Sequence, residues 1–181
     1  KRMPEFLAAF RDQKNAEPVA FASVMKDLGR LFGNGASAEA SRALLQEVLA
    51  SNADPEWRIA TMLGLAEGIS GRAKEFGTSP KGLLYAILGN NASGSDISAL
   101  DNFVNRALDI AGKQTESNRL RISATALLGY TDFERSHSAL QKMMVPSTPP
   151  ELLLEAISAL ARLDDPRGAA ILLEKKAWSA Y

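Results

Sequence analysis

A pattern of two consecutive helices, present twice in the last third of the sequence, constrains this chain more than any other feature. Residues 120–144 begin as an amphipathic helix, break at a polar turn and begin again as a second helix, and residues 153–177 do the same. The turn residue Asp132 then corresponds to Asp165. The shared apolar positions are Leu120 and Leu153, Ala124 and Ile157, Leu127 and Leu160, and Tyr130 and Leu163. Their spacing of three, four and seven residues places them on one side of an α-helix.

Each such pair of helices has an apolar side that it cannot bury by itself. Stacking the next pair against it forms a continuous core, which explains why the pattern is repeated. A weaker copy of the first helix lies earlier in the chain, at 54–68, where Arg58 corresponds to Arg121 and Leu65 to Leu128. The sequence therefore predicts stacked helix pairs along most of the chain.

No window alternates apolar and polar residues as a half-buried strand does, so we expect an all-α protein. The stacked pairs predict a right-handed α-solenoid (superhelix) that forms a single domain over residues 1–181. The helix pairs are expected at about 18–52, 54–111, 115–145 and 148–178. Individual helices are expected at 18–32, 37–50, 54–68 and 95–111, with a short helix at 83–88 in an insertion rich in Gly, Ser and Asn. In the first helix the residues expected on one face are Phe21, Val24, Met25, Leu28, Leu31 and Phe32.

Polar residues that accept from free backbone N–H groups mark the expected helix starts. Thr131 with Glu134, and Thr148 with Glu151, have the spacing of a capping box, in which a hydroxyl and a carboxylate each bond a backbone N–H. Pro149 would then lie just inside its helix, where its missing N–H costs nothing.

Other helix starts combine a short polar residue with proline or glycine. Asp54-Pro55 and Asp165-Pro166 predict a cap followed by proline at the first helical position. Ser37, after the turn "GNGAS", and Ser95 are the expected caps of two further helices. The same kind of start signal thus recurs along the chain.

Composition excludes several classes of function. Lys+Arg and Asp+Glu both number 21, so the net charge is zero, which argues against a nucleic-acid surface or an anionic membrane as partner. Absence of cysteine excludes disulfides, zinc–thiolate sites and covalent haem within this chain. The longest apolar runs, such as 83–88, are far shorter than the roughly 20 residues of a membrane span. The chain opens "KRMPEFLAAF" and ends at Tyr181 directly after a predicted helix, so we expect a segment of a longer protein.

The residues that invite a chemical interpretation have simpler structural ones. His137 shares a helical stripe with Phe133 and Leu140, and Ser136 and Ser138 point elsewhere on that helix, so a Ser-His-Asp triad is disfavoured. "GNGAS" at 33–37 lacks the G-K-[ST] of a phosphate-binding loop. "SGSD" and Asp101 lack the spacing of a calcium loop. We expect no catalytic residue, no cofactor and no metal.

Four further features have a structural interpretation as well. Asp164 and Asp165 lie where a helix must be capped. Asn91-Ala92-Ser93 matches a glycosylation sequon, a common triplet by chance. Trp57 is expected to pack against the preceding helix pair, and Trp178 to lie in the last helix, exposed for want of a covering repeat.

Polar residues that fall off the apolar stripes of the second helices are the candidates for partner contact. They are Arg135, Gln141, Lys142 and Lys175. These side chains would line a concave surface if the solenoid curves in the usual sense. We predict them as partner-binding residues, with a simply solvated face as the alternative.

The runs "DPEWRIATMLGLAEGISG" (54–71) and "ESNRLRISATALLGYTD" (116–132) resemble HEAT repeats. They are similar in particular to the helical-repeat segment of large planctomycete and verrucomicrobial membrane-associated dehydrogenase-like proteins, where it lies between a sugar-dehydrogenase-like propeller and a c-type cytochrome domain. The resemblance covers about 54–181, and less clearly 18–52. It implies an extracytoplasmic bacterial scaffold between redox domains. The C-x-x-C-H haem motif and the propeller are absent here, so neither activity is assigned to this chain.

Two functions are consistent with these observations. The first is a non-enzymatic scaffold that contacts a protein or the neighbouring domains of its own longer polypeptide. The alternative is a HEAT-like enzyme domain that binds nucleic acid or a small ligand. The alternative requires a face dense in Lys and Arg with aromatic residues, or a pocket with convergent acids.

Overall fold

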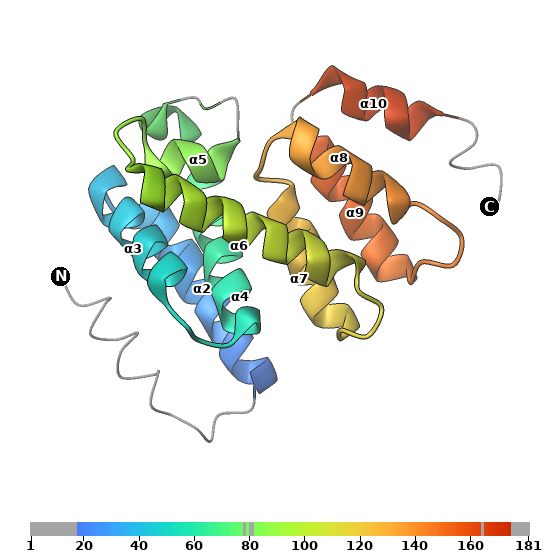
Figure 1. Ribbon diagram of the computed structural model, residues 1–181, viewed down its shortest axis with the longest axis horizontal. Helices are drawn as coiled ribbons and strands as arrows, with labels where there is room; N and C mark the ends of the chain where they lie inside the picture. Colours follow the sequence, from blue (N-terminus) through green and yellow to red (C-terminus); the bar gives the residue numbers. More distant parts are fainter. Residues whose placement is uncertain (1–17, 78, 80–81, 164, 175–181) are drawn as a thin grey trace. The chain divides into compact units, whose positions relative to one another are not determined.

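The computed structural model describes residues 18–77, 79, 82–163 and 165–174 (Figure 1). Every regular element in these ranges is a helix, so the all-α prediction is confirmed. The predictions for Asp164, Lys175 and Trp178 fall outside the described residues. The chain divides into two compact units, residues 1–78 with 86–100 and residues 79–85 with 101–181. The single repeat domain therefore stays a prediction, and each unit is described by itself.

The helices begin and end close to where the sequence pattern places them. In chain order they are α2 (Pro18–Gly35), α3 (Ala38–Ala50), α4 (Pro55–Ser70), the 3₁₀ helix η1 (Ala73–Phe76), α5 (Leu83–Leu88), α6 (Gly94–Gly112), α7 (Asn118–Leu128), α8 (Phe133–Lys142), α9 (Pro150–Arg162) and α10 (Pro166–Leu173). The boundary between the units falls within α5 and within α6. The first helix continues to Gly35, past its predicted end at 32, through part of "GNGAS".

Helices α2 and α4 of the first unit pack against each other through glycines. Each carries the pattern Gly-x-x-x-Gly, at Gly29 and Gly33 in α2 and at Gly64 and Gly68 in α4. Residues four apart lie on the same side of a helix, and glycines there let a second backbone come close. A Cβ atom at Gly33 would lie 2.6 Å from the carbonyl oxygen of Leu65, closer than real Cβ atoms approach.

The glycines of α4 face the backbone of α2. A Cβ atom at Gly64 would clash with the carbonyl oxygen of Lys26, and one at Gly68 with that of Arg30. Because the contacts advance in the same direction along both helices, α2 and α4 run parallel. Lys26 Nζ also pairs with Glu67 Oε1 of α4 at 2.8 Å. Close backbone approach at the glycines is therefore a defining feature of this packing.

The buried face of α2 differs from the predicted one. Met25 is buried as predicted, but Val24 and Leu31 are 45% and 67% exposed. Ala22 and the two glycines occupy the buried face in their place. The prediction was wrong for Val24 and Leu31, because hydrophobic periodicity gives weight to large residues, whereas a close helix contact requires small ones.

In the second unit α7 packs against α9, and a glycine again lies at the contact. A Cβ atom at Gly129 would lie 3.0 Å from both the Cα and the carbonyl oxygen of Ala159. Helix α9 also contacts α8 and α10, and α10 contacts α8 (Figure 1). The two hairpins α7–α8 and α9–α10 are therefore neighbours, as the repeated sequence pattern requires.

Two corresponding arginines bond to the end of the helix that precedes their own. Arg58 of α4 donates from Nε to the carbonyl oxygen of Val48 at 3.1 Å and from Nη2 to that of Leu49 at 3.2 Å, at the end of α3. Arg121 of α7 donates from Nε to Ala111, at the end of α6, at 3.2 Å. The last carbonyls of a helix lack partners within it, and a cation there is favourable. The matching arginines noted in the sequence thus have the same structural task.

Three of the predicted helix caps are confirmed. Asp54 accepts from the backbone N–H of Glu56, Asp165 from that of Arg167, and Ser37 from that of Ala40. In each case the side-chain oxygen satisfies an N–H that has no partner inside its helix.

Three other predicted caps are wrong. Asp132, not Thr131, caps α8, because Thr131 is buried and its hydroxyl donates back to Leu128. Ser93, not Ser95, accepts from the N–H of Asp96 at the start of α6. The predicted Thr148–Glu151 box does not cap α9: the preceding residue is a proline without a capping bond, and the helix begins one residue later at Pro150.

Replacing Gly64 by alanine tests the glycine contact. The new Cβ would meet main-chain atoms, which cannot rotate away as a side chain can. We expect the free energy of unfolding to fall by about 3 kcal/mol or more, measured by urea denaturation.

Gly35→Ala is the matched control for this substitution. Gly35 ends α2 and has no neighbouring atom within 4 Å of an added Cβ. Alanine there should leave stability unchanged or raise it by up to about 1 kcal/mol, through helix propensity. Equal effects of the two substitutions would contradict the packing described here.

Candidate functional site

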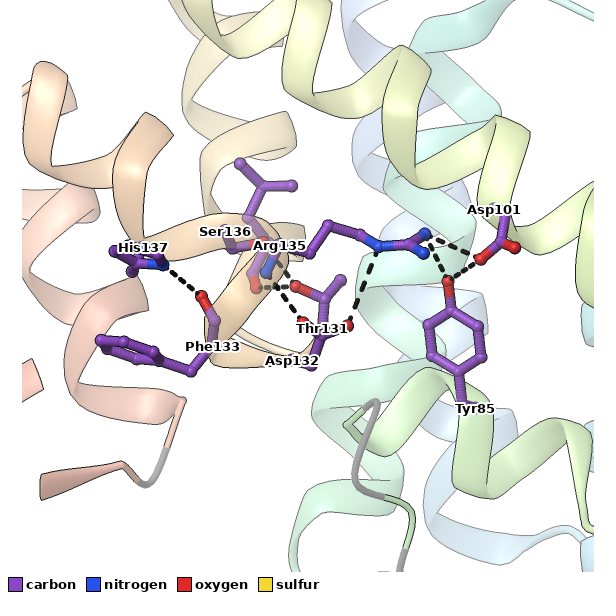
Figure 2. A network of polar contacts seen from close by, with 9 residues as sticks. Tyr85, Asp101, Thr131, Asp132, Phe133, Arg135, Ser136 and His137 are labelled. Carbon is purple, nitrogen blue, oxygen red and sulfur yellow. Dashed lines mark hydrogen bonds and ion pairs between the residues drawn. The ribbon is translucent and has the colours of Figure 1, made fainter. Parts of the chain in front are cut away.

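Polar side chains of the second unit gather around the start of α8 (Figure 2). Asp132 positions them, because its Oδ1 accepts from the backbone N–H of Arg135 at 2.8 Å and fixes the first turn of α8. From this turn Arg135 extends toward Asp101 and Tyr85, whereas His137 lies on another side of the helix beside Phe133 (Figure 2). The cluster therefore has two separate parts.

The first part is a closed triangle of hydrogen bonds. Arg135 Nη1 donates to Asp101 Oδ1 and to the Tyr85 hydroxyl oxygen, both at 2.7 Å, and that hydroxyl donates to the same Asp101 oxygen at 2.5 Å. Arg135 Nε lies 3.8 Å from Asp132 Oδ2. The three residues come from α5, α6 and α8, so the triangle joins three helices.

Burial governs the electrostatics of this triangle. Tyr85 is 7% exposed, and burial together with the hydrogen bond to Asp101 raises the pKa of its hydroxyl far above the ordinary value. Tyr85 therefore remains a neutral donor, and Arg135 supplies the positive charge that balances Asp101. A tyrosine in this state is a poor general base or nucleophile. The arrangement is suited to holding helices together.

Two buried hydroxyls lie at the same helix start. Thr131 Oγ1 and Ser136 Oγ are 2.5 Å apart, and Thr131 donates to the carbonyl oxygen of Leu128 at 2.7 Å. Ser136 is fully buried, so it is not accessible to a substrate. The hydroxyls link the turn to the end of α7.

The second part of the cluster surrounds His137. Its Nδ1–H donates to the carbonyl oxygen of Phe133 at 2.8 Å, and its ring stacks on the Phe133 ring with centroids 4.5 Å apart and planes at 6°. Since the carbonyl can only accept, Nδ1 carries the proton. His137 is thus held by its own helix turn, and the structure does not bring it together with Ser136 or Ser138 as a triad would require.

Arg167 of α10 adds ion pairs beside the same aromatic ring. Its guanidinium carbon lies 4.2 Å from the centroid of Phe133, and its nitrogens pair with Asp165 at 2.8 Å and with Glu134 at 2.7 Å. The hydrogen bonds from Arg167 lower the pKa of the Asp165 carboxyl to about 2. Asp165 therefore serves as a cap and as an ion-pair partner, as its place at a helix start indicated.

The structure describes three of the four predicted partner-binding residues. Arg135 is half-buried in the triangle, whereas Gln141 and Lys142 are exposed at the end of α8. Lys175 lies outside the described residues. Partner contact by Gln141 and Lys142 stays a prediction.

The sequence reasoning missed Tyr85 and considered Asp101 only as a calcium ligand. One signal was present, because the Tyr85 hydroxyl is the only side-chain polar atom in the run "LLYAIL" and requires a partner when that run is buried. Nothing in the spacing of Tyr85, Asp101 and Arg135 indicates that they meet. Their juxtaposition depends on tertiary packing.

The described ranges show no group of three His, Asp or Glu side chains placed to hold a metal ion. None of the helices in the described part of the chain is long and apolar enough to cross a membrane, in agreement with the predicted absence of a span there. Comparisons of the chain with protein-family models, with curated proteins and with solved structures give no match.

Arg135→Met tests the triangle. The substitution keeps much of the aliphatic chain but leaves Asp101 and the Tyr85 hydroxyl without their cation, so we expect a loss of about 1–2 kcal/mol in the free energy of unfolding by urea denaturation. Lys142→Met, at an exposed position of the same helix, should change stability by less than about 0.5 kcal/mol. If Arg135→Met left the free energy of unfolding unchanged, the triangle would not stabilise the fold.

Arg167→Met should return the pKa of Asp165 toward its ordinary value, measured by carboxyl ¹³C NMR titration. In the protein without this substitution, the Asp165 carboxyl should titrate with a midpoint at about pH 2. Because the folded pKa lies below the ordinary one, the stabilisation by the Asp165 carboxylate is present above about pH 4 and is lost as the pH falls toward 2. A midpoint that does not move in the variant would contradict the assigned cause.

Proposed function

We propose that this chain is a non-catalytic α-helical scaffold built of stacked HEAT-like helix pairs in a right-handed solenoid. It would contact a protein partner or the neighbouring domains of a longer polypeptide. The observation that carries the proposal is the arrangement of α7–α8 beside α9–α10. Their second helices begin at the caps Asp132 and Asp165, which are corresponding positions of the repeated pattern, and their first helices pack against each other.

The use of polar side chains supports a structural role. Arg135, His137 and Asp165, which could each be imagined in catalysis, contact other parts of the same unit and stabilise helix starts or helix packing. Arg58 and Arg121 do the same at helix ends. Side chains engaged in this way are suited to holding the helices in place, which supports the scaffold proposal.

Charge pairing favours the scaffold over a nucleic-acid-binding enzyme domain. The ion pairs among described residues include Lys26 with Glu67, Arg30 with Asp27, Arg72 with Glu75, Lys113 with Glu116, Arg135 with Asp101, Arg162 with Glu155, and Arg167 with Asp165. A surface that binds phosphates needs basic side chains without acidic neighbours. The resemblance to the helical segment of membrane-associated dehydrogenase-like proteins supports placing the scaffold in a larger redox-type protein.

Site-specific photo-crosslinking tests this function. A benzoylphenylalanine placed at Gln141 or at Lys142, in cells that make the full-length protein, should give a discrete adduct with another protein or with another domain of the same polypeptide. Both positions are exposed, so the substitution should not disturb the fold.

Glu39, which is exposed on α3, is the control position and should give no discrete adduct. Adducts at none of these positions, or equally at all three, would contradict partner contact at the end of α8. Binding of a labelled oligonucleotide that weakens steeply with salt would instead support the nucleic-acid-binding alternative.

A further inference from the structure

Asn34 and Gly35 form an asparagine–glycine pair at the end of α2. Both residues are exposed, and no atom lies within 4 Å of a Cβ added at Gly35. Asparagine is chemically labile, and a following glycine makes it more so, because no side chain shields the glycine nitrogen from the asparagine amide carbon. Asn34 is the only asparagine of the sequence that precedes a glycine.

Deamidation of such a pair needs only water. The backbone nitrogen of Gly35 loses its proton and attacks the side-chain amide carbon of Asn34, the carbon–nitrogen bond of that amide breaks, and ammonia leaves with the proton. Water then opens the resulting succinimide ring at either carbonyl. The products are aspartate and isoaspartate. In isoaspartate the main chain passes through the side-chain carbons and is one atom longer.

The helical conformation of α2 blocks the first step. Within an α-helix the N–H of Gly35 donates to the carbonyl four residues earlier, so its nitrogen is not free to attack the neighbouring side chain. The following bond is present too, because the N–H of Ala36 donates to the carbonyl oxygen of Phe32 at 2.8 Å. The helix is thus closed as far as its last residue, and the pair reacts only when this last turn opens.

Arg72, between α4 and η1, contacts the last turn of α2. Its Nη1 donates to the carbonyl oxygen of Asn34 at 3.0 Å and to that of Gly33 at 3.5 Å. Its Nη2 and Nε donate to Glu75 Oε2 at 2.6 and 3.1 Å, and its guanidinium carbon lies 5.7 Å from the centroid of the Phe76 ring. These contacts fix the guanidinium where it holds the two carbonyls of α2.

The backbone of α4 packs on the same turn. A Cβ atom at Gly68 would lie 2.9 Å from the backbone nitrogen of Asn34 and 3.0 Å from Gly33 Cα. The main chain at Asn34 therefore has no space for the additional atom of an isoaspartate. Once this product has formed, the turn cannot pack on α4 as before.

We propose that Asn34–Gly35 is a deamidation site that the α2–α4 contact keeps unreactive, with Arg72 as the side chain that holds the last turn closed. Opening of this turn starts the reaction, and isoaspartate prevents the turn from closing again. The pair thus converts a transient opening of the first unit into a lasting one. This property concerns packing inside the unit and is independent of the proposed scaffold function.

Peptide mass spectrometry of the incubated chain tests the proposal. Trypsin releases residues 31–42, in which Asn34 has the only amide side chain, so a rise in the mass of this peptide reports deamidation at Asn34. At mildly alkaline pH the folded chain should react about tenfold or more slowly than the chain unfolded in urea, since the rate follows the open fraction. Gly35→Ala should lose most of the reaction in urea, because its methyl group shields the nitrogen.

Arg72→Met tests the role of the arginine. The substitution keeps much of the aliphatic chain but removes the donors to α2, so deamidation of the folded chain should become about three- to tenfold faster. Lys74→Met removes the same charge at an exposed position two residues away and should change the rate by about twofold or less. In urea both variants should react as fast as the chain without substitutions. Circular dichroism confirms that each variant is folded in buffer.

Equal rates in buffer and in urea would overturn the proposal, because the fold would then give no protection. A peptide that stays unmodified in urea would overturn it as well, because the pair would not be reactive. Equal rates for Arg72→Met and Lys74→Met would overturn the role of Arg72.

Urea denaturation of the deamidated protein tests the lasting opening. The deamidated fraction carries one more negative charge and separates by ion exchange. It should unfold at a lower urea concentration than the unmodified fraction, because the α2–α4 contact is lost at this turn. The same midpoint for both fractions would show that the turn closes over the product, and would contradict a lasting opening.

Discussion

Close backbone approach at small residues is the constraint on which the rest of the structure depends. Between α2 and α4 it occurs at two Gly-x-x-x-Gly patterns, and between α7 and α9 at Gly129 and Ala159. Carbonyl oxygens of the neighbouring helix occupy the space that a side chain would need, so a larger residue fits only if the helices separate. The distance between parallel helices is thereby fixed within each unit. That distance in turn sets which carbonyl oxygens of a neighbouring helix an arginine side chain can contact.

Arginines complete this arrangement at the helix ends. Arg58, Arg72, Arg121 and Arg162 donate to carbonyl oxygens near the C-terminal ends of α3, α2, α6 and α7. Carbonyls in the last turn of a helix lack the usual partner four residues further along the helix, and the partial negative charge of a helix end favours a cation. The Tyr85–Asp101–Arg135 triangle extends the same use of arginine to helix packing. Side chains that could bind a substrate in another setting here contribute to rigidity, and this is the physical basis of the proposed scaffold role.

The sequence predicted most of the helices and half of the caps, because these depend on residues close together in the chain. The 3.6-residue period located α3, α4, α6 and α7, and Asp54, Asp165 and Ser37 act as caps where their types predict. Thr131 failed as a cap because its buried hydroxyl bonds Leu128 and Ser136, and the next residue, Asp132, caps the helix in its place. The α2 face and the Arg135 triangle could not be predicted from periodicity, since both depend on which helix lies opposite. For the α2 face, however, the sequence does contain an indication, namely the Gly-x-x-x-Gly spacing at 29–33 and 64–68.

The most direct test of this account is a set of NOEs between α-hydrogens in the assigned NMR spectrum of the chain. A Cβ atom at Gly68 would lie 3.0 Å from Gly33 Cα, and one at Gly129 would lie 3.0 Å from Ala159 Cα. Hydrogens of these residue pairs must therefore be close in space, and we predict NOE cross-peaks for Gly33–Gly68 and for Gly129–Ala159. Assigned spectra that show the helices but lack both cross-peaks would contradict the close parallel packing, and with it the stacked-helix scaffold.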